Sequence, residues 1–478
     1  MTNNGSLPSA VAQLEIICGS FSARLAKILP PELRALAFCG PASFREPEID
    51  NIWHPYMLRR SFLFFLWDQL PKMTRALAGG VRRFVLGRFG SYTLRLCPSA
   101  EVLGLTPISI CTVTPTGVET KYCHPDDALR MSWLVINDFG KETVGYPVSR
   151  LKMSKTFLSL LYCWSSISFP LAFYNRDWAV ASMITLRWIF SLQWSIQWML
   201  GLKVREVLKN GTFKKVFCVH ETHPWSRMVW SEAKQQGVST ITIQHASVSR
   251  TKLWYFPMAE ELQTGLAMPD EFVVFSQKEQ ALLKPFFPSA TRFYLGCGPR
   301  FSQWQTVKVE LARQEDPRAP VLFVSSVPWW DNEVVLSGVK KLVEDSKGRP
   351  IIVRMHPLAV VPRKWQKWLK KMEQKEVLEI SKVSLAEDLR RAVALVGMNT
   401  TVLEEGLLMG KTSIVLQSEH YLSFATSLVE PISLGALSWH KIEQSIVESQ
   451  IVREQLIKSG RDALGLEKPV FRITGANI

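Results

Sequence analysis

Short apolar runs alternate with helix-like segments along the second half of the chain, and this pattern predicts parallel α/β layering. Short continuous runs are typical of strands that are buried on both faces of a sheet. In order, they are VFCVHE, VSTITIQHA, EFVVFS and RFYLGCGP, then PVLFVSS, PIIVRMHP, VLEIS, AVALVG and TSIVLQ. A polar stretch at 303–319 separates the two groups, so we expect two domains, at 1–305 and 306–478. The last helical pattern, at 440–463, is expected to pack back on the first domain.

The first half of the chain has a different pattern, mainly helical over its first hundred or so residues and then mixed, with strand-like ISICTVTP and WLVINDF. Two segments, 156–174 and 178–202, are nearly all apolar and long enough in principle to span a bilayer. Pro170 interrupts the first segment, and Arg187 lies in the middle of the second. Three interpretations stay open: helices buried in a large domain, helices lying at the membrane interface, and a spanning hairpin.

Basic residues are concentrated near the N-terminus. The formal net charge is +15, and the 17 Trp residues suit interiors, sugar faces and bilayer interfaces. Between positions 51 and 100, Asp68 is the one acidic residue, against Arg59, Arg60, Lys72, Arg75, Arg82, Arg83, Arg88 and Arg95. Apolar residues interleave with these charges, which predicts a basic amphipathic helix within 55–95 that contacts a membrane surface. No DNA- or RNA-binding motif occurs, so we expect no nucleic-acid partner.

The eight Cys residues are scattered and form no CxxC pair, which predicts neither a zinc site nor a disulfide framework. The sequence begins without a charged segment followed by a long apolar run, so we expect no secretory signal. These features predict a cytoplasmic protein that is peripheral on the inner face of the cytoplasmic membrane.

The first candidate for chemistry is the group Arg354, His356 and Pro357, directly after the expected strand PIIV. Ligands of open α/β sheets bind beyond the carboxyl ends of the strands. Proline ends the strand there and fixes the turn, which places His356 where it can donate to a phosphate. The alternative is a histidine satisfied within a turn.

The second candidate follows the expected strand AVALV and comprises Asn399, Thr400 and Thr401. Small and hydroxyl residues at a helix N-terminus offer backbone and side-chain donors to a phosphate. The alternative, an ordinary helix cap by Asn399 or Thr400, is compatible with phosphate binding. One turn into the same helix, Glu405 is placed to accept both hydroxyls of a ribose, unless Glu404 and Glu405 belong to a solvated helix face.

A third polar segment, SKVSLAEDL, has a structural explanation. Ser384 is expected to cap a helix, with Glu387 in the capping-box position.

The run SLAEDLRRAVALVGMNTTVLEEGLLMGK resembles the donor half of GT-B glycosyltransferases. In that family a Glu one turn into this helix commonly holds the nucleotide ribose, and Glu405 with its spacing to Gly410 matches it. The His-Pro pair with a following hydroxyl pair is similar to bacterial polysialyltransferases and Kdo transferases, where these elements hold the phosphate of a CMP-sugar. His356 and Thr400-Thr401 match them, although the pair here is Thr-Thr rather than Ser-Ser.

A second run, VHETHPWSRMVWSEAKQQGVSTITIQHASVSRTKLWYF, looks like the acceptor-side pattern of bacterial surface-carbohydrate biosynthesis proteins. The resemblance covers about 214–410. It implies an α/β fold of the GT-B type, with two Rossmann-like domains facing an interdomain cleft and extra N-terminal helices. The first domain is then the acceptor side, with helical insertions at 55–95 and 156–202, and the second binds the donor.

The implied activity is transfer of a sialic-acid-like or Kdo-like sugar from a CMP donor to a bacterial surface polysaccharide or lipid-linked glycan. Enzymes of this kind use no bound metal and no cofactor beyond the donor substrate, and no cluster with metal-ligand spacing occurs here. His356, Thr400 and Thr401 would stabilise the leaving phosphate. Glu221 is our choice of general base, with His220, His223 and His245 as competitors. Trp225 is expected in the core.

Other interpretations stay open. CDP-glycerol phosphotransferases of teichoic-acid synthesis also carry a His-Pro pair and a hydroxyl-rich turn, but usually with an Asp before the pair, where this chain has Asn399. An NDP-hexose donor is another alternative. A non-catalytic assembly protein at the inner membrane would keep the fold for binding only.

Overall fold

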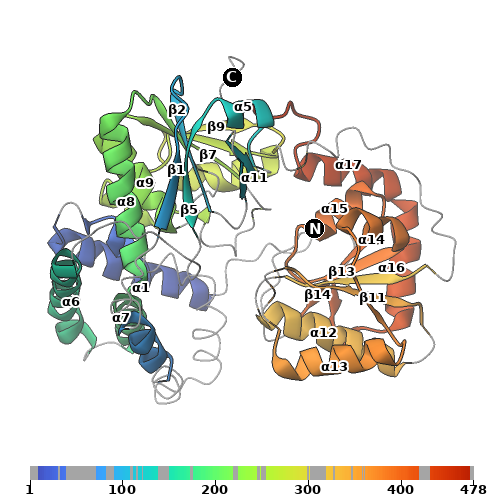
Figure 1. Ribbon diagram of the computed structural model, residues 1–478. Helices are drawn as coiled ribbons and strands as arrows, with labels where there is room; N and C mark the ends of the chain where they lie inside the picture. The colour runs from blue at the N-terminus through green and yellow to red at the C-terminus, as the bar shows by residue number, and fades with distance from the viewer. Residues whose placement is uncertain are drawn as a thin grey trace. The chain divides into compact units, whose positions relative to one another are not determined.

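The computed structural model divides the chain into two compact units: unit 1, Met1–His245, Lys252–Arg300 and Val470–Ile478, and unit 2, Ala246–Thr251 and Phe301–Pro469. The structure describes residues 9–30, 33–38, 71–81, 91–107, 111–114, 117–120, 122–137, 150–172, 176–218, 224–244, 248, 255–298, 301, 319–326, 329–345, 348–357, 359, 361–418 and 431–473. The expected interdomain stretch at 303–319 lies, except for Ala319, outside the described residues. Each unit contains its own sheet of mainly parallel strands with helices packed on it (Figure 1).

Unit 1 is built on a seven-stranded sheet in the order β1-β5-β2-β6-β7-β8-β9. Its strands are β1 (Ser91–Arg95), β2 (Val102–Pro107), β5 (Ser132–Asn137), β6 (Lys215–Cys218), β7 (Ser239–Ile243), β8 (Glu271–Val274) and β9 (Arg292–Leu295). All neighbours are parallel except β1, which pairs antiparallel with β5. Strands β6 to β9 confirm the four expected runs. A separate two-stranded sheet joins β3 (Cys111–Val113) and β4 (Val118–Thr120).

The expectation of basic helix over 55–95 is wrong at its C-terminal end. Residues 71–81 are helical, but 91–95 form β1, because their backbone pairs with residues 133–137 of β5 at the edge of the sheet. The other residues of that segment lie outside the described part of the chain.

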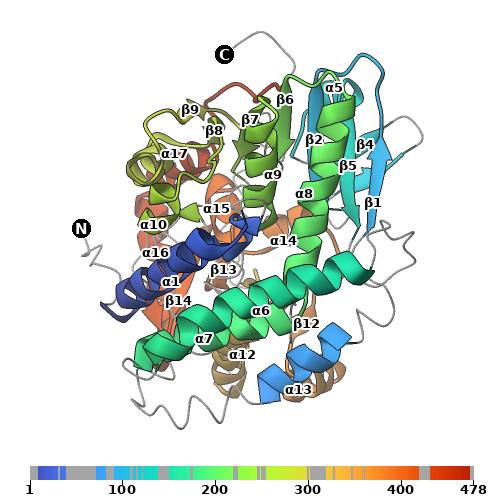
Figure 2. The ribbon, with the colours of Figure 1, turned by 90° about the vertical axis from the view of Figure 1, so that its left-hand side faces the viewer.

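The apolar stretch between 150 and 210 forms three helices: α6 (Arg150–Ala172), α7 (Arg176–Phe190) and α8 (Gln193–Asn210). Pro170 lies in the last turn of α6 and does not break it. The second apolar segment is broken at Leu192, which adopts φ 53°, and not at Arg187. Helices α6 and α7 pack together with α1 (Ser9–Ile28), and α8 packs on α9 (Pro224–Gln235) (Figure 2).

Buried side chains are frequent on α7 and α8. Trp188, Trp194 and Met199 are completely inaccessible to solvent, which agrees, for the segment 178–202, with the first of the three interpretations, helices buried within a large domain; on α6, Leu158 and Tyr162 are exposed. Burial lowers the pKa of Arg187 to about 10. Among the residues that the structure describes, no helix is both long and apolar enough to cross a membrane.

Unit 2 contains a six-stranded, all-parallel sheet in the order β12-β11-β10-β13-β14-β15. Its strands are β10 (Val321–Val324), β11 (Ile351–Arg354), β12 (Glu379–Ile380), β13 (Ala394–Gly397), β14 (Thr412–Gln417) and β15 (Ile432–Ser433). Numbered along the chain, this is the 3-2-1-4-5-6 order of the doubly wound Rossmann fold. The five expected runs are confirmed, and β15 is an addition.

Helices cover both faces of this sheet. They are α12 (Trp329–Glu344), α13 (Arg363–Gln374), α14 (Leu385–Arg391), α15 (Val402–Leu408), α16 (Trp439–Ile451) and α17 (Arg453–Ala463). Side chains of α12, α13 and α16 share one hydrophobic core with the strands. Figure 1 shows α14 and α15 on the face opposite α12 and α13. The predicted α/β class, with Rossmann-like units and extra N-terminal helices, is confirmed by the two sheets, whereas the GT-B interdomain cleft stays a prediction.

The C-terminal part of the chain corrects one expectation. The predicted helical segment at 440–463 forms α16 and α17, but both helices belong to unit 2 and not to the first domain. There, Gly460 lets α17 approach α15 closely. A Cβ at Gly460 would lie 3.0 Å from Leu407 Cβ. Instead, Val470 and the residues after it return to unit 1, where Val470 pairs with Cys297 beyond β9.

Candidate functional site

The candidate site lies at the carboxyl edge of the unit 2 sheet, where the strand order reverses between β10 and β13. In the β10–β11 register Val324 lies opposite Arg354, and in the β10–β13 register Phe323 lies opposite Val396. The segments that follow these three strands therefore leave the sheet side by side, within two strand spacings of roughly 10 Å in total. Sites of doubly wound sheets occupy this position.

The loops after β10 and β11 are joined by a hydrogen bond. The backbone N–H of His356 donates to the hydroxyl of Ser325 over 2.7 Å, and the Ser325 N–H donates to the carbonyl of Arg354 over 3.0 Å. The carbonyl of His356 accepts from Ala359 within the turn. These bonds fix the backbone at His356 and leave its half-buried side chain at the strand end.

A buried carboxylate joins the loops after β10 and β13. Asp331, in the first turn of α12, has no exposed surface, and its Oδ2 accepts from the Ser326 hydroxyl. Its Oδ1 accepts from the Asn399 amide over 2.7 Å. Asp331 and both serines were missing from the sequence-derived site. Their signal is the pair of serines and the Asp-Asn pair at the two ends of SSVPWWDN, between a strand and a helix that begins at the switch point.

The two threonines differ in their local contacts. The Thr400 hydroxyl accepts from the Val402 N–H over 3.3 Å, while Thr401 is the N-cap residue of α15 and its side chain makes no capping hydrogen bond. Gly397 permits this turn, because a Cβ there would lie 2.8 Å from Val324 Cγ2. Neither threonine is fully buried.

The acidic pair on α15 is buried rather than solvated. Glu404 and Glu405 are 8% and 5% exposed, so the alternative of a solvated helix face is wrong. The left-handed Gly410 (φ 63°) follows the end of the helix.

Arg354 points toward the neighbouring strand end. Its Nη1 donates to Asp388 Oδ2 over 2.7 Å, to the Ser381 hydroxyl over 3.1 Å and to the Val383 carbonyl over 2.9 Å. Asp388 has no exposed surface, so this pair ties the β12–α14 loop to β11. The expected cap is confirmed nearby, where Ser384 accepts from the Glu387 N–H.

The unit 1 candidates are Glu221, His220, His223 and His245, and all four lie outside the described residues. The described residue directly before His245 is held by side-chain hydrogen bonds. At the end of β7, Gln244 donates to Glu279 over 2.6 Å and accepts from the Phe275 N–H over 3.0 Å. Trp225 is 8% exposed, which confirms it as a core residue.

No protein-family model matches the chain. No curated protein matches it either. Among solved structures, it is similar to UDP-GlcNAc 2-epimerase from Neisseria meningitidis bound to UDP-GlcNAc, with 13% identity, TM-score 0.37, and coverage of 57% of this chain and 78% of that one. A putative UDP-N-acetylglucosamine 2-epimerase from Listeria monocytogenes gives 14% identity, TM-score 0.39, and coverage of 56% and 77%.

The pneumococcal O-GlcNAc transferase GtfA, in complex with UDP and GlcNAc, gives 9% identity and TM-score 0.39 over 55% of this chain and 57% of that one. At these identities and TM-scores, the likenesses assign neither an activity nor a substrate to this chain. The doubly wound strand order and the contacts above place the candidate site at the switch point of a Rossmann-type sheet.

Proposed function

We propose that this protein is a glycosyltransferase whose unit 2 binds a nucleotide-sugar donor at the switch point. One observation supports it most directly: His356 and Asn399, in the loops that follow the two strands flanking β10, are held by the hydrogen bonds that they donate to Ser325 and Asp331. A preformed set of donors at the carboxyl ends of adjacent parallel strands suits the phosphates of a nucleotide.

In the proposed reaction the acceptor hydroxyl attacks the anomeric carbon of the sugar, and the bond to the leaving phosphate breaks. His356, Thr400 and Thr401 stabilise the negative charge that develops on this phosphate, without a metal ion. Glu405 holds the ribose, and Glu221 takes the proton from the acceptor hydroxyl. Arg354 supports the His356 loop through Asp388.

The donor in this proposal is a CMP-linked, sialic-acid-like or Kdo-like sugar, on the strength of the His-Pro and Thr-Thr elements. The acceptor is a bacterial surface polysaccharide or lipid-linked glycan, and the enzyme works at the inner face of the cytoplasmic membrane. The net charge of +15 supports attraction to an anionic surface.

A thermal-shift screen with CMP, CDP, UDP and GDP tests the donor class. A nucleotide at about 100 times its Kd stabilises the folded state by about 2.7 kcal/mol. We expect CMP to give the largest shift. A larger shift with CDP would favour the glycerophosphotransferase alternative, and one with UDP or GDP the NDP-hexose alternative.

Two variants connect the shift to the site. Thr401→Val keeps the shape of the side chain and removes its hydroxyl, so the CMP shift should shrink. Lys234→Met, on the exposed surface of α9 in unit 1, is the control and should keep the full shift. No stabilisation by any of the four nucleotides would contradict the proposed function.

A further inference from the structure

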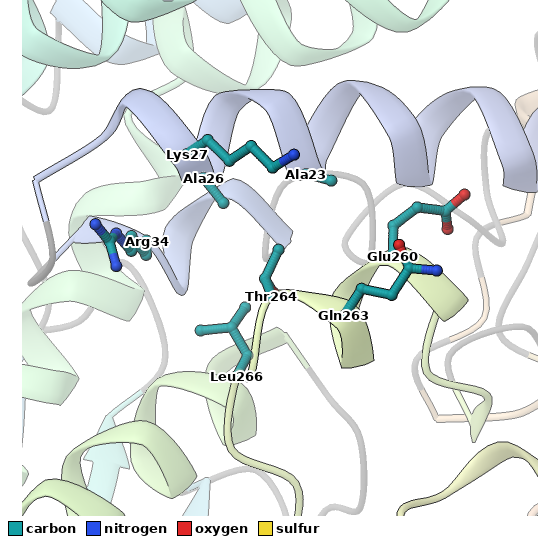
Figure 3. Close-up of a pocket in the computed structure, with 8 residues that line it drawn as sticks. All are labelled: Ala23, Ala26, Lys27, Arg34, Glu260, Gln263, Thr264 and Leu266. Carbon is teal, nitrogen blue, oxygen red and sulfur yellow. The ribbon is translucent and has the colours of Figure 1, made fainter.

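A cavity of about 350 Å³ lies in unit 1 between α1 and the segment that contains α10 (Ala259–Gln263). It is lined by Ala23, Ala26, Lys27, Arg34, Glu260, Gln263, Thr264 and Leu266 (Figure 3). Small-molecule sites span about 300–1,000 Å³, so this one suits a single substituted ring rather than a nucleotide sugar.

Two cations, Lys27 and Arg34, line this cavity. Among the residues that the structure describes, none forms an ion pair or hydrogen bond with the side chains of Lys27 or Arg34. Figure 3 shows Lys27 extending along α1 beside Ala23, with Arg34 at the other end of the cavity. Two cations beside one cavity, with no partner in the described part of the chain, favour an anionic ligand.

The carboxylate in the lining does not neutralise them. Glu260 Oε1 accepts from the Ser20 hydroxyl over 3.4 Å, and the carboxylate packs against Gly19, where an added Cβ would lie 2.3 Å from Glu260 Oε2. Figure 3 shows this carboxylate directed away from Lys27 and Arg34.

The remaining lining offers both apolar and hydrogen-bonding surface. Ala23, Ala26 and Leu266 present carbon atoms that suit the C–H face of a sugar ring. The Gln263 amide supplies donors and an acceptor for ring hydroxyls. The Thr264 hydroxyl donates to the Glu261 carbonyl over 2.7 Å, which leaves its oxygen as an acceptor.

We propose that this cavity binds one acidic monosaccharide unit, a pyranose that carries a carboxylate or a phosphate group. Lys27 and Arg34 contact the acid group, and the alanine face of α1 contacts the ring. The site lies wholly in unit 1, so its occupancy does not depend on the donor site proposed for unit 2.

Direct titration of the full-length protein with glucuronate, glucose 6-phosphate and glucose, followed by calorimetry or ligand-observed NMR, tests this proposal. We expect saturable binding of at least one of the two acids, and binding of neutral glucose at least tenfold weaker. The two acidic probes identify which acid group the site prefers. Equal affinity for glucose and both acids would overturn the proposal.

Variants separate a built site from general surface charge. Lys27→Met and Arg34→Met should each weaken binding of the acid by about fivefold, the effect of one exposed charge pair. Ala23→Leu keeps both charges and fills the cavity, so it should weaken binding at least tenfold. Lys234→Met, an exposed cation on α9, is the matched control and should bind as the wild type does.

Wild-type affinity in Ala23→Leu would overturn the proposal, as would wild-type affinity in the Lys27→Met/Arg34→Met double variant. Circular dichroism checks that each variant is folded. A protein that binds the acid in unit 1 but no nucleotide would contradict the proposed function and leave this inference standing.

Discussion

At the scale of single residues, the buried carboxylate of Asp331 is the most consequential contact of the candidate site. It accepts from Ser326 and Asn399 on two different loops, and a carboxylate acceptor makes each of these bonds charge-assisted. We expect Asp331→Asn to lower the free energy of unfolding by about 1.5–3 kcal/mol, because hydrogen bonds to a charged group are lost in a buried site.

Urea denaturation measures that loss. Nucleotide titration measures its effect on the site, where we expect a higher Kd and little change in the amount of nucleotide bound at saturation. The control is Asp345→Asn, at an exposed position directly after α12. Equal urea midpoints for the two variants would show that Asp331 does not organise these loops.

The proposed reaction assigns different defects to its two principal residues. His356→Ala should lower turnover about 10²–10³-fold through loss of one preorganised donor, and Glu221→Ala should lower it further. Steady-state transfer assays measure both. Near-normal transfer by Glu221→Ala would remove it as the base, and unchanged donor binding and turnover in His356→Ala would remove the phosphate assignment.

Lys411, directly before β14, predicts a pH dependence of stability. It is 1% exposed, and burial, with a smaller contribution from Arg453, lowers its pKa from 10.5 to about 8. Between pH 8 and 10.5 the unfolded chain binds this proton and the folded chain does not, so this group stabilises the fold progressively as the pH rises. Below pH 8 both states are protonated, and that gain is absent.

We therefore expect the difference in unfolding free energy between pH 9.5 and 7.5 to be about 1–2 kcal/mol larger in the wild type than in Lys411→Met. Urea denaturation at both pH values measures it. Comparing the two proteins cancels titrations that they share. The same pH response in both would contradict a lowered pKa at Lys411.

Some residues of the candidate site could be predicted from the local sequence, and others could not. His356, Asn399 and the threonines stand directly after strand patterns, so the general rule for parallel sheets located them. Asp331 lies 68 positions from its partner Asn399, and its burial depends on how α12 packs, which no local pattern encodes. Arg354 sits at a strand end, but the position of Asp388 determines where its guanidinium points.

At the scale of elements, residues 470–473 form a strap that completes unit 1. The Phe471 N–H donates to the Cys297 carbonyl, and Arg472 Nη2 pairs with Asp127 Oδ1 over 3.2 Å. The Ile473 N–H donates to Asp127 Oδ2 over 2.7 Å. Asp127 has no exposed surface, so these partners compensate a buried charge.

Ending the chain at Pro469 should therefore lower the unfolding free energy of unit 1 by about 3–5 kcal/mol, the cost of leaving such a charge unpaired. Arg472→Met should cost less, because Ile473 still donates to Asp127. Hydrogen exchange read separately for the two units checks both variants. A truncated chain with unchanged protection in β9 would contradict a stabilising strap.

The boundaries of elements show where sequence patterns stop being sufficient. The apolar segment 178–202 has no Pro, and its one Gly, Gly201, lies far from the break at Leu192. Leu192 itself adopts a left-handed conformation that costs an L-residue roughly 1–2 kcal/mol. Packing of buried Trp188 and Trp194 on either side supplies the compensation. Such a break is decided by tertiary contacts, so a helical pattern alone predicts one long helix.

At the scale of the whole molecule, the alternation of strands and helices identified nine parallel strands because buried parallel strands are continuous apolar runs. The N-terminal helices were harder to predict, since an all-apolar helix has the same composition whether it packs in protein or in lipid. The described helices α7 and α8 bury most of their apolar side chains within unit 1.

Apart from the short segment Ala246–Thr251, unit 2 is one continuous segment of the chain, from Phe301 to Pro469, directly before the strap. All six strands of its sheet, β10 to β15, lie within this segment, and one hydrophobic core joins that sheet to α12, α13 and α16. A domain of about 150 residues buries roughly 68–70% of its surface on folding, which is sufficient for independent stability. We expect a fragment of residues 301–469 to unfold cooperatively in urea.

A shorter fragment, 301–438, is the control. It lacks α16, whose Trp439, Ile442 and Ile446 belong to the core, and α17, which packs on α15 through Gly460. Losing both should expose the sheet and abolish the cooperative transition. If 301–469 also lacks a cooperative transition, unit 2 depends on unit 1 for its stability, and the donor site cannot be studied in isolation. If it folds, a nucleotide that stabilises the whole protein through unit 2 should stabilise the fragment as well.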